Sequence, residues 1–325
     1  MYEQFFGLNE RPFDLTPNPK YLFLTPSHRE ALSNLKYGIS ARTGVTVLIG
    51  EAGTGKTTLI RATLESPEGE KTHAIYLNNP TLTRTEFLEF LAREFQLPAS
   101  AAASKTGLLE LLEQSLMELR RSDITPALII DEAQSLPHEL LEEIRLLANI
   151  ETTTEKLLPI VLAGQPELAD RLNHTSLRQL KQRIGLRCQL KPLDLRETAA
   201  YITARIGVAG GTASSLFTRD AVILVHERAQ GIPRLISVIC HNSLISAFAL
   251  SKRPISADVV REVCEDFDLK HVDAMGTFST SVGEDAAGDG RHPVDIIRQS
   301  STLEKKPGRE MFAGLGRPRR WYSVF

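Results

Sequence analysis

The sequence predicts an α/β protein in which a parallel sheet is sandwiched by helices, followed by a small all-helical domain and a C-terminal tail. Three observations favour this fold. Short apolar runs alternate with helical patterns between residues 45 and 190, which is typical of a parallel sheet with helices on both faces. A glycine-rich turn links the first run to a helix. Strand patterns stop after Pro192, and only helical periodicity follows.

Length and composition are those of an ordinary globular protein. The chain has 325 residues, enough for about two domains. Its hydrophobic content of 42% and charged content of 24% are ordinary for a globular protein and argue against a fibrous or wholly disordered one. The 38 basic and 40 acidic side chains nearly balance, which excludes a globally basic nucleic-acid-binding protein but leaves room for a local basic patch.

The cysteines and the apolar stretches predict a reducing, cytoplasmic setting. Cys188, Cys240 and Cys264 lie far apart and form no C-x-x-C pair, so neither a disulfide framework nor a zinc ribbon is expected. The start of the chain lacks the regions of an export signal. The longest apolar stretch, residues 235–250, contains polar residues and is shorter than the ~20 residues that cross a bilayer. We therefore expect no membrane span.

The first element is a lead-in. Residues 1–26 are rich in aromatic residues and proline, so we expect an extended segment packed on a domain surface and no helix there. The first helix is expected at residues 27–42. Ser27 and Glu30 have the spacing of a capping box, and apolar residues follow at helical spacing.

Strands and helices then alternate up to residue 191. We expect strands at residues 45–49, 72–77, 127–130, 157–163 and 185–190. We expect helices at residues 56–64, 83–95, 105–121, 138–150 and 176–183. Together with the lead-in, these elements predict a first domain over residues 1–191.

The rest of the chain divides into a helical domain and a tail. Helical periodicity predicts a small domain over residues 192–270, with helices at residues 195–206, 218–229, 232–251 and 256–267. Residues 273–325 contain seven glycines and few aliphatic residues, so we expect a disordered tail over residues 271–325. The tail is acidic first and basic later: residues 291–325 hold eight bases and three acids.

The clearest chemistry lies in the glycine-rich turn. Residues 50–57 match G-x-x-x-x-G-K-[ST] between a strand and a helix, the context that this phosphate-binding motif requires. The glycines let backbone N–H groups converge on phosphate oxygens, and the helix N-terminus adds its positive dipole end. Lys56 is expected to reach the β- and γ-phosphates, and Thr57 to bind Mg²⁺. The predicted ATP-binding residues are Gly50, Glu51, Ala52, Gly53, Thr54, Gly55, Lys56, Thr57 and Thr58.

A second motif follows the apolar run at residues 127–130, where two carboxylates stand at the expected carboxyl edge of the sheet. Ligands bind at that edge in open α/β folds. Asp131 is expected to bind Mg²⁺ with Thr57, and Glu132 to orient or deprotonate the attacking water. An acidic pair after a strand can instead be a helix N-cap, but the phosphate-binding motif upstream favours the catalytic interpretation.

Several further segments point to one family. In order they are FFGLNERPFDLTPNP, SHREALSNLKYGI, DEAQSL, VLAGQPEL, LRQLKQRI and QGIPRLI. With the two nucleotide motifs, this series resembles the AAA+ ATPases of the P-loop fold, and more narrowly the secretion-associated ATPases of the ExeA/GspA type. Their ATPase domain is similar to that of the MuB/TnsC-like transposition ATPases. The resemblance covers about residues 1–270.

The resemblance implies further site residues. Gln165, after the apolar run at residues 157–163, would be the sensor-1 residue that contacts the γ-phosphate or the attacking water. Arg183 would be an arginine finger that completes a neighbouring subunit's site, with Arg178 as the rival candidate. Arg234 would be the sensor-2 arginine of the lid, which the helical domain would form.

The resemblance also implies a function. It predicts Mg²⁺-dependent ATP hydrolysis coupled to self-association into a ring or filament, and to the remodelling or recruitment of a secretion or envelope-associated partner complex. The alternative is a nucleotide-gated platform on DNA that hydrolyses ATP slowly. Family members tied to secretion commonly continue into a membrane span and a peptidoglycan-binding region, and we expect neither in this sequence. The arginines and aromatics of residues 317–325 suit contact with nucleic acid, an anionic membrane surface or a protein partner.

Overall fold

The computed structural model describes residues 1–14, 19–78, 81–98, 101 and 104–268. The tail expected over residues 271–325 lies outside these described residues. Among them, no helix is both long enough and apolar enough to cross a membrane.

The sheet has five parallel strands in the order β2-β3-β4-β1-β5. The strands are β1 (Val45–Ile49), β2 (Thr72–Leu77), β3 (Thr125–Ile130), β4 (Ile160–Gly164) and β5 (Ile184–Gln189). The three central strands are almost wholly buried, which is why they read in the sequence as continuous apolar runs. The predicted α/β fold with a parallel sheet is therefore confirmed.

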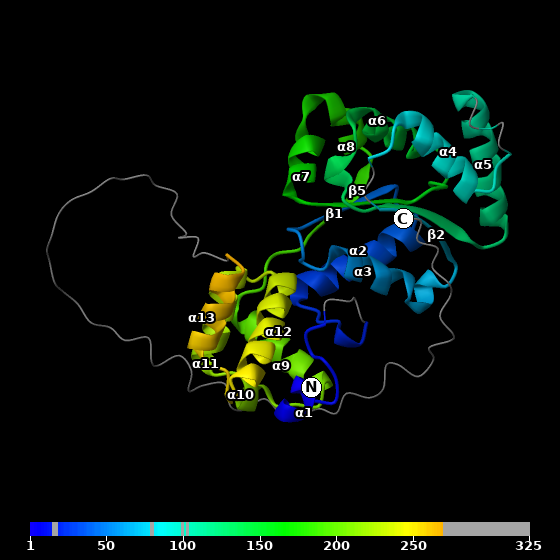
Figure 1. The fold of residues 1–325 in the computed structure, drawn as a ribbon. Helices are drawn as coiled ribbons and strands as arrows, with labels where there is room; N and C mark the ends of the chain where they lie inside the picture. Colours follow the sequence, from blue (N-terminus) through cyan, green and yellow to red (C-terminus); the bar gives the residue numbers. More distant parts are fainter. Residues whose placement is uncertain (15–18, 79–80, 99–100, 102–103, 269–325) are drawn as a thin grey trace, which may run out of the picture. The chain divides into compact units, whose positions relative to one another are not determined.

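Helices cover both faces of the sheet (Figure 1). One face is covered by α2 (Pro26–Ser40) and α3 (Lys56–Leu64). The other face is covered by α4 (Arg84–Glu94), α5 (Lys105–Arg121), α6 (His138–Leu147), α7 (Pro166–Asn173) and α8 (Arg178–Lys181). Alternate residues of β1 point to opposite faces: Leu48 packs against α2 and α3, and Val47 packs in the cluster on the other face.

The helices that follow the sheet share a separate core. They are α9 (Leu195–Val208), α10 (Ala213–Leu216), α11 (Arg219–Ala229), α12 (Pro233–Ala249) and α13 (Ala257–Asp266). Their buried side chains, among them Ile206, Val225 and Leu244, form one cluster. We call these five helices the lid.

The lead-in differs from the prediction. The expectation that residues 1–26 contain no helix is wrong, because Tyr2–Phe6 form the short helix α1 and Pro19–Tyr21 a 3-10 turn. A five-residue helix is too short to be stable alone, and burial of Phe6 and Phe13 in the lid cluster stabilises this segment. The aromatic residues therefore pack on the lid.

Two other local predictions need correction. The first long helix is capped by Thr25, whose side chain accepts the backbone N–H of His28, and not by a capping box from Ser27. Pro26 occupies the first helical position, where its fixed φ suits a helix start. The helix expected at residues 176–183 is reduced to a 3-10 turn and the four-residue α8, whereas the unpredicted α7 begins at Pro166.

Candidate nucleotide-binding and hydrolysis site

Three neighbouring strands bring the predicted phosphate-binding loop, the acidic pair and Gln165 to one edge of the sheet. β3, β4 and β1 are adjacent and parallel. Asp131 follows β3, Gln165 follows β4 and Gly50 follows β1. Because parallel strands end at the same edge, these residues converge there although up to 115 positions separate them in the sequence.

Two glycines shape the backbone of the phosphate-binding loop. Gly53 and Gly55 have φ angles of +83° and +101°, in the region that only glycine adopts at little cost. The Thr54 hydroxyl donates to the Glu51 carbonyl at 2.8 Å and closes the loop. The loop therefore leads directly into the N-terminus of α3.

Lys56 lies inside this loop. Its Nζ donates to the carbonyls of Gly50 at 2.8 Å and Glu51 at 3.1 Å. Burial lowers the pKa of Lys56, and the nearby charges of Glu132 and Asp131 oppose this shift. The loop thus holds a desolvated ammonium group where phosphate oxygens would enter.

Asp131 joins the two nucleotide motifs. Its Oδ2 accepts the Thr57 hydroxyl at 2.6 Å, and the buried carboxylate also accepts the Tyr76 hydroxyl at 2.8 Å. Burial, followed by the charge of Asp131, raises the pKa of Tyr76 well above its usual range, so the phenol remains a donor. A hydroxyl and a carboxylate side by side are hard oxygen ligands, which fit Mg²⁺. No cluster of three or more His, Cys, Asp or Glu suited to a metal is present among the described residues.

Glu132 is held by two amide side chains. Its Oε2 accepts Nε2 of Gln134 at 2.6 Å and Nε2 of Gln165 at 3.2 Å. Burial raises the pKa of Glu132, but these hydrogen bonds and the charge of Lys56 outweigh burial and lower it overall. Glu132 is therefore ionised at neutral pH and suited to orient a water molecule.

The lid contacts the phosphate-binding loop through Arg234. Its backbone N–H, at the start of α12, donates to the Gly53 carbonyl at 3.2 Å. A Cβ on Gly53 would lie 2.7 Å from Cβ of Arg234. The Arg234 side chain is exposed and lines the cavity described next.

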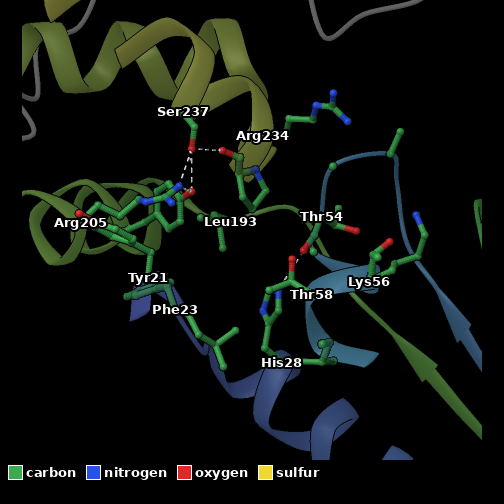
Figure 2. Close-up of a pocket in the computed structure, with 18 of the residues that line it drawn as sticks. Tyr21, Phe23, His28, Thr54, Lys56, Thr58, Leu193, Arg205, Arg234 and Ser237 are labelled. Atoms are coloured by element: carbon green, nitrogen blue, oxygen red, sulfur yellow. Dashed lines mark hydrogen bonds between the residues drawn. The ribbon is translucent and has the colours of Figure 1, made fainter. Parts of the chain in front are cut away.

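A cavity of about 500 Å³ separates the loop from the lid. Figure 2 shows Thr54, Thr58 and Lys56 across from the lid residues Arg205 and Ser237. Apolar and aromatic side chains complete the wall on the lid side, which suits a nucleotide base. They are Tyr21, Leu22, Phe23, Leu193, Tyr201 and Pro233.

Two buried polar side chains fix the walls of this cavity. Nε2 of His28 lies 3.0 Å from the Thr54 carbonyl, so α2 supports the phosphate-binding loop. On the lid side, Nη1 of Arg205 donates to the hydroxyls of Tyr201 at 2.6 Å and Ser237 at 2.9 Å. The Arg205 guanidinium also lies 4.9 Å from the ring centroid of Tyr21, a cation–π contact that joins the lead-in to the lid.

The two arginine-finger candidates lie apart from this cavity. Arg178 begins α8 and Arg183 precedes β5; both side chains are exposed. Neither lines the cavity of its own chain. Their role in a neighbouring subunit remains a prediction.

Comparison with known proteins identifies the family of this site. Residues 40–172 match the family model described as an AAA domain. Over 255 residues the chain is 44% identical to general secretion pathway protein A of Aeromonas hydrophila. The aligned region covers 78% of this chain and 46% of that protein. The chain carries an AAA+ ATPase domain of the general secretion pathway protein A type. It spans about half the length of that relative.

Two solved structures have a similar fold. The Aeropyrum pernix ORC2 protein, in its ADPNP and ADP complexes, gives a TM-score of 0.58 at 19% identity over 79% of this chain and 72% of that chain. Cdc6p from Pyrobaculum aerophilum also gives 0.58 at 19% identity, over 78% of this chain and 70% of that chain. At this identity the likeness concerns the fold alone.

Sequence reasoning missed three residues that touch the predicted site. Tyr76 stands on β2 and reaches Asp131 because β2 pairs with β3. Gln134 follows Glu132 by two positions, in the DEAQSL segment. His28 stands in the SHRE segment. Only Gln134 had a local signal, its closeness to Glu132.

Proposed function

We propose that this AAA+ domain binds ATP with Mg²⁺ in the cavity between the phosphate-binding loop and the lid, hydrolyses it, and uses the ATP state to control self-assembly and partner engagement. The observation that carries the proposal is the 2.6 Å hydrogen bond between Thr57 and Asp131. It joins the two nucleotide motifs beside Lys56 and Glu132.

Different residues would bind the phosphates, Mg²⁺ and the base. Backbone N–H groups of residues 51–57 and the start of α3 would hold the phosphates, with Lys56 at the β- and γ-phosphates. Thr57 and Asp131 would hold Mg²⁺, which neutralises phosphate charge when bound. The apolar wall around Tyr21, with the lid, would cover the base. The exposed guanidinium of Arg234 would reach the γ-phosphate from the lid side.

Hydrolysis would be an in-line attack by water. Glu132, ionised and held by its two amide partners, would accept a hydrogen bond from that water and orient it, and Gln165 would contact the same water or the γ-phosphate. Lys56 and Arg234 would neutralise the charge that develops on the transferred phosphoryl group. A neighbour's Arg183, which is exposed and does not line the cavity of its own chain, would complete the site in trans.

The test is ATP turnover per subunit as a function of protein concentration. Turnover is expected to rise with concentration, and Glu132→Gln is expected to bind ATP yet lose turnover. Arg183→Ala should lose on the order of 10³-fold in turnover with ATP binding retained, whereas Arg178→Ala and the exposed control Arg187→Ala should not. Turnover of Arg183→Ala equal to that of the wild type would remove Arg183 from the site.

The proposed biological role is based on the similarity to general secretion pathway protein A. We propose that ATP-driven assembly of this chain remodels or recruits a secretion or envelope-associated complex. The same assay with duplex DNA tests the role: turnover unaffected by DNA agrees with a protein client. Strong stimulation by DNA that falls steeply with salt would instead favour the DNA platform.

A further inference from the structure

Gln134 bridges the ends of two strands. It lies in the short 3-10 turn Ala133–Ser135 that follows Asp131 and Glu132. Its Nε2 donates to Oε2 of Glu132 at 2.6 Å, and its Oε1 accepts the backbone N–H of Gln165 at 3.0 Å. One amide group therefore connects the carboxylate after β3 to the backbone after β4.

The fold leaves room for this bridge. Gly164 ends β4, and a Cβ built on it would lie 2.8 Å from Oε1 of Gln134, closer than real Cβ atoms approach. Glycine at this position lets the amide reach the Gln165 backbone. The turn itself is held from α7, because the Arg171 guanidinium donates to the backbone carbonyls of Gln134 and Leu136.

The bridge determines how Glu132 is presented. The φ of Glu132 is +52°, a left-handed conformation that is costly for a residue other than glycine. Among the described residues, both side-chain hydrogen bonds to its carboxylate go to Oε2, and the one from Gln134 is the shorter, at 2.6 Å against 3.2 Å from Gln165. A carboxylate held through one oxygen can direct its other oxygen at a water molecule.

We propose that Gln134 is a positioning residue for hydrolysis: it holds Oε2 of Glu132 and so directs Oε1 at the attacking water. The proposal rests on the proposed hydrolysis by Glu132 and deepens it. Gln134 acts through Glu132 and does not touch the nucleotide. Gln165 alone does not substitute, because its own hydrogen bond to Glu132 is long and its backbone is held by Gln134.

The test compares Gln134→Met with Glu132→Gln. Met keeps the length of the side chain and removes both amide hydrogen bonds. Loss of a short hydrogen bond to a charged group predicts a fall in kcat of about 10- to 100-fold, with the Kd for ATP changed less than about twofold. The control Gln114→Met, at an exposed position of α5, should leave both unchanged. Thermal unfolding of each variant shows whether it is folded.

A double variant separates positioning from a general structural effect. In single-turnover experiments on preformed ATP complexes, Gln134→Met should cost less than about twofold when Glu132 is already Gln. Gly164→Ala should lower kcat to a similar extent, because the added Cβ would displace the Gln134 amide although Gln134 itself is unchanged. Three results would each overturn the proposal. Gln134→Met could lower the single-turnover rate equally with Glu132 or Gln at position 132, it could weaken ATP affinity and leave kcat unchanged, or it could retain the wild-type kcat.

Failure of the underlying function gives a different result. If Glu132→Gln hydrolyses ATP as fast as the wild type, Glu132 does not orient the water, and the proposals for Glu132 and Gln134 fail together. If Glu132→Gln is inactive and Gln134→Met retains wild-type kcat, only the role of Gln134 is wrong.

Discussion

Substitution of Gly53 by Ala tests how closely the lid and the phosphate-binding loop are coupled. Gly53 has a φ of +83°, and a Cβ there would lie 2.7 Å from Cβ of Arg234 and 3.2 Å from Cγ2 of Ile232. Neither neighbour is the end of a flexible side chain. The lid must therefore move away from the loop, and the hydrogen bond from the Arg234 backbone to Gly53 is lost.

The cost can be worked out from two contributions. A left-handed backbone costs an L-residue about 1–2 kcal/mol, and the overlap with Arg234 and Ile232 costs about 1–3 kcal/mol. The first cost applies to the loop itself and the second to the docked lid, so the arrangement that binds ATP, with the loop formed and the lid in contact, is destabilised by about 2–5 kcal/mol. At about 1.4 kcal/mol per factor of ten, ATP affinity should fall by at least about 30-fold.

Titration calorimetry of ATP into the variant measures this effect. The matched control is Gly207→Ala in α9, where a Cβ would meet nothing within 4 Å. Relief of glycine's entropic cost in a helix should make that variant more stable by about 0.5–1 kcal/mol, with ATP affinity unchanged. An ATP Kd for Gly53→Ala within threefold of the wild type, in a folded protein, would refute close contact between lid and loop.

Two further predictions concern Asp131 and the lead-in. Tyr76→Phe removes the 2.8 Å hydrogen bond to Asp131, so the Mg²⁺ concentration for half-maximal turnover should rise about tenfold; an unchanged Mg²⁺ titration would show that Thr57 alone orients the carboxylate. Phe13→Ala removes a fully buried ring that packs against Phe217. It should lower the free energy of unfolding, measured in urea, by about 3–5 kcal/mol. The control Tyr37→Ala, at a side chain that is 59% exposed, should lower it by less than about 0.5 kcal/mol.

The sequence predicted the sheet well because its strands have local signals. The runs at residues 45–49 and 127–130 are buried on both faces. A strand buried on both faces consists mostly of apolar residues, which can be recognised in the sequence. Helix α1 has no such signal, because burial of Phe6 against lid residues far along the chain stabilises it. Helix α7 was missed although Pro166 stands at its first position, where proline is common.

In the candidate site, too, residues in local motifs were predictable and contacts between strands were not. Lys56, Thr57 and Asp131 belong to motifs that can be read within a few residues. The contacts of Tyr76 and Gln134 depend on which strands are neighbours, and strand order cannot be read from local patterns. Gln134 reaches the Gln165 backbone only because β4 lies beside β3 and ends in a glycine.

Contacts between the lead-in, the lid and the phosphate-binding loop surround the cavity, so we expect nucleotide binding to affect residues away from the phosphates. Tyr21, from the lead-in, stacks on Arg205 of the lid, and Arg205 in turn holds Ser237 on α12. Arg234, at the start of α12, contacts Gly53 in the loop. These contacts form a continuous path around the cavity, so a nucleotide that binds more tightly when they are intact would stabilise the lead-in, lid and loop together. Because thermodynamic coupling is reciprocal, loss of the lead-in contact at Tyr21 must weaken ATP binding to the same degree as ATP binding stabilises that contact.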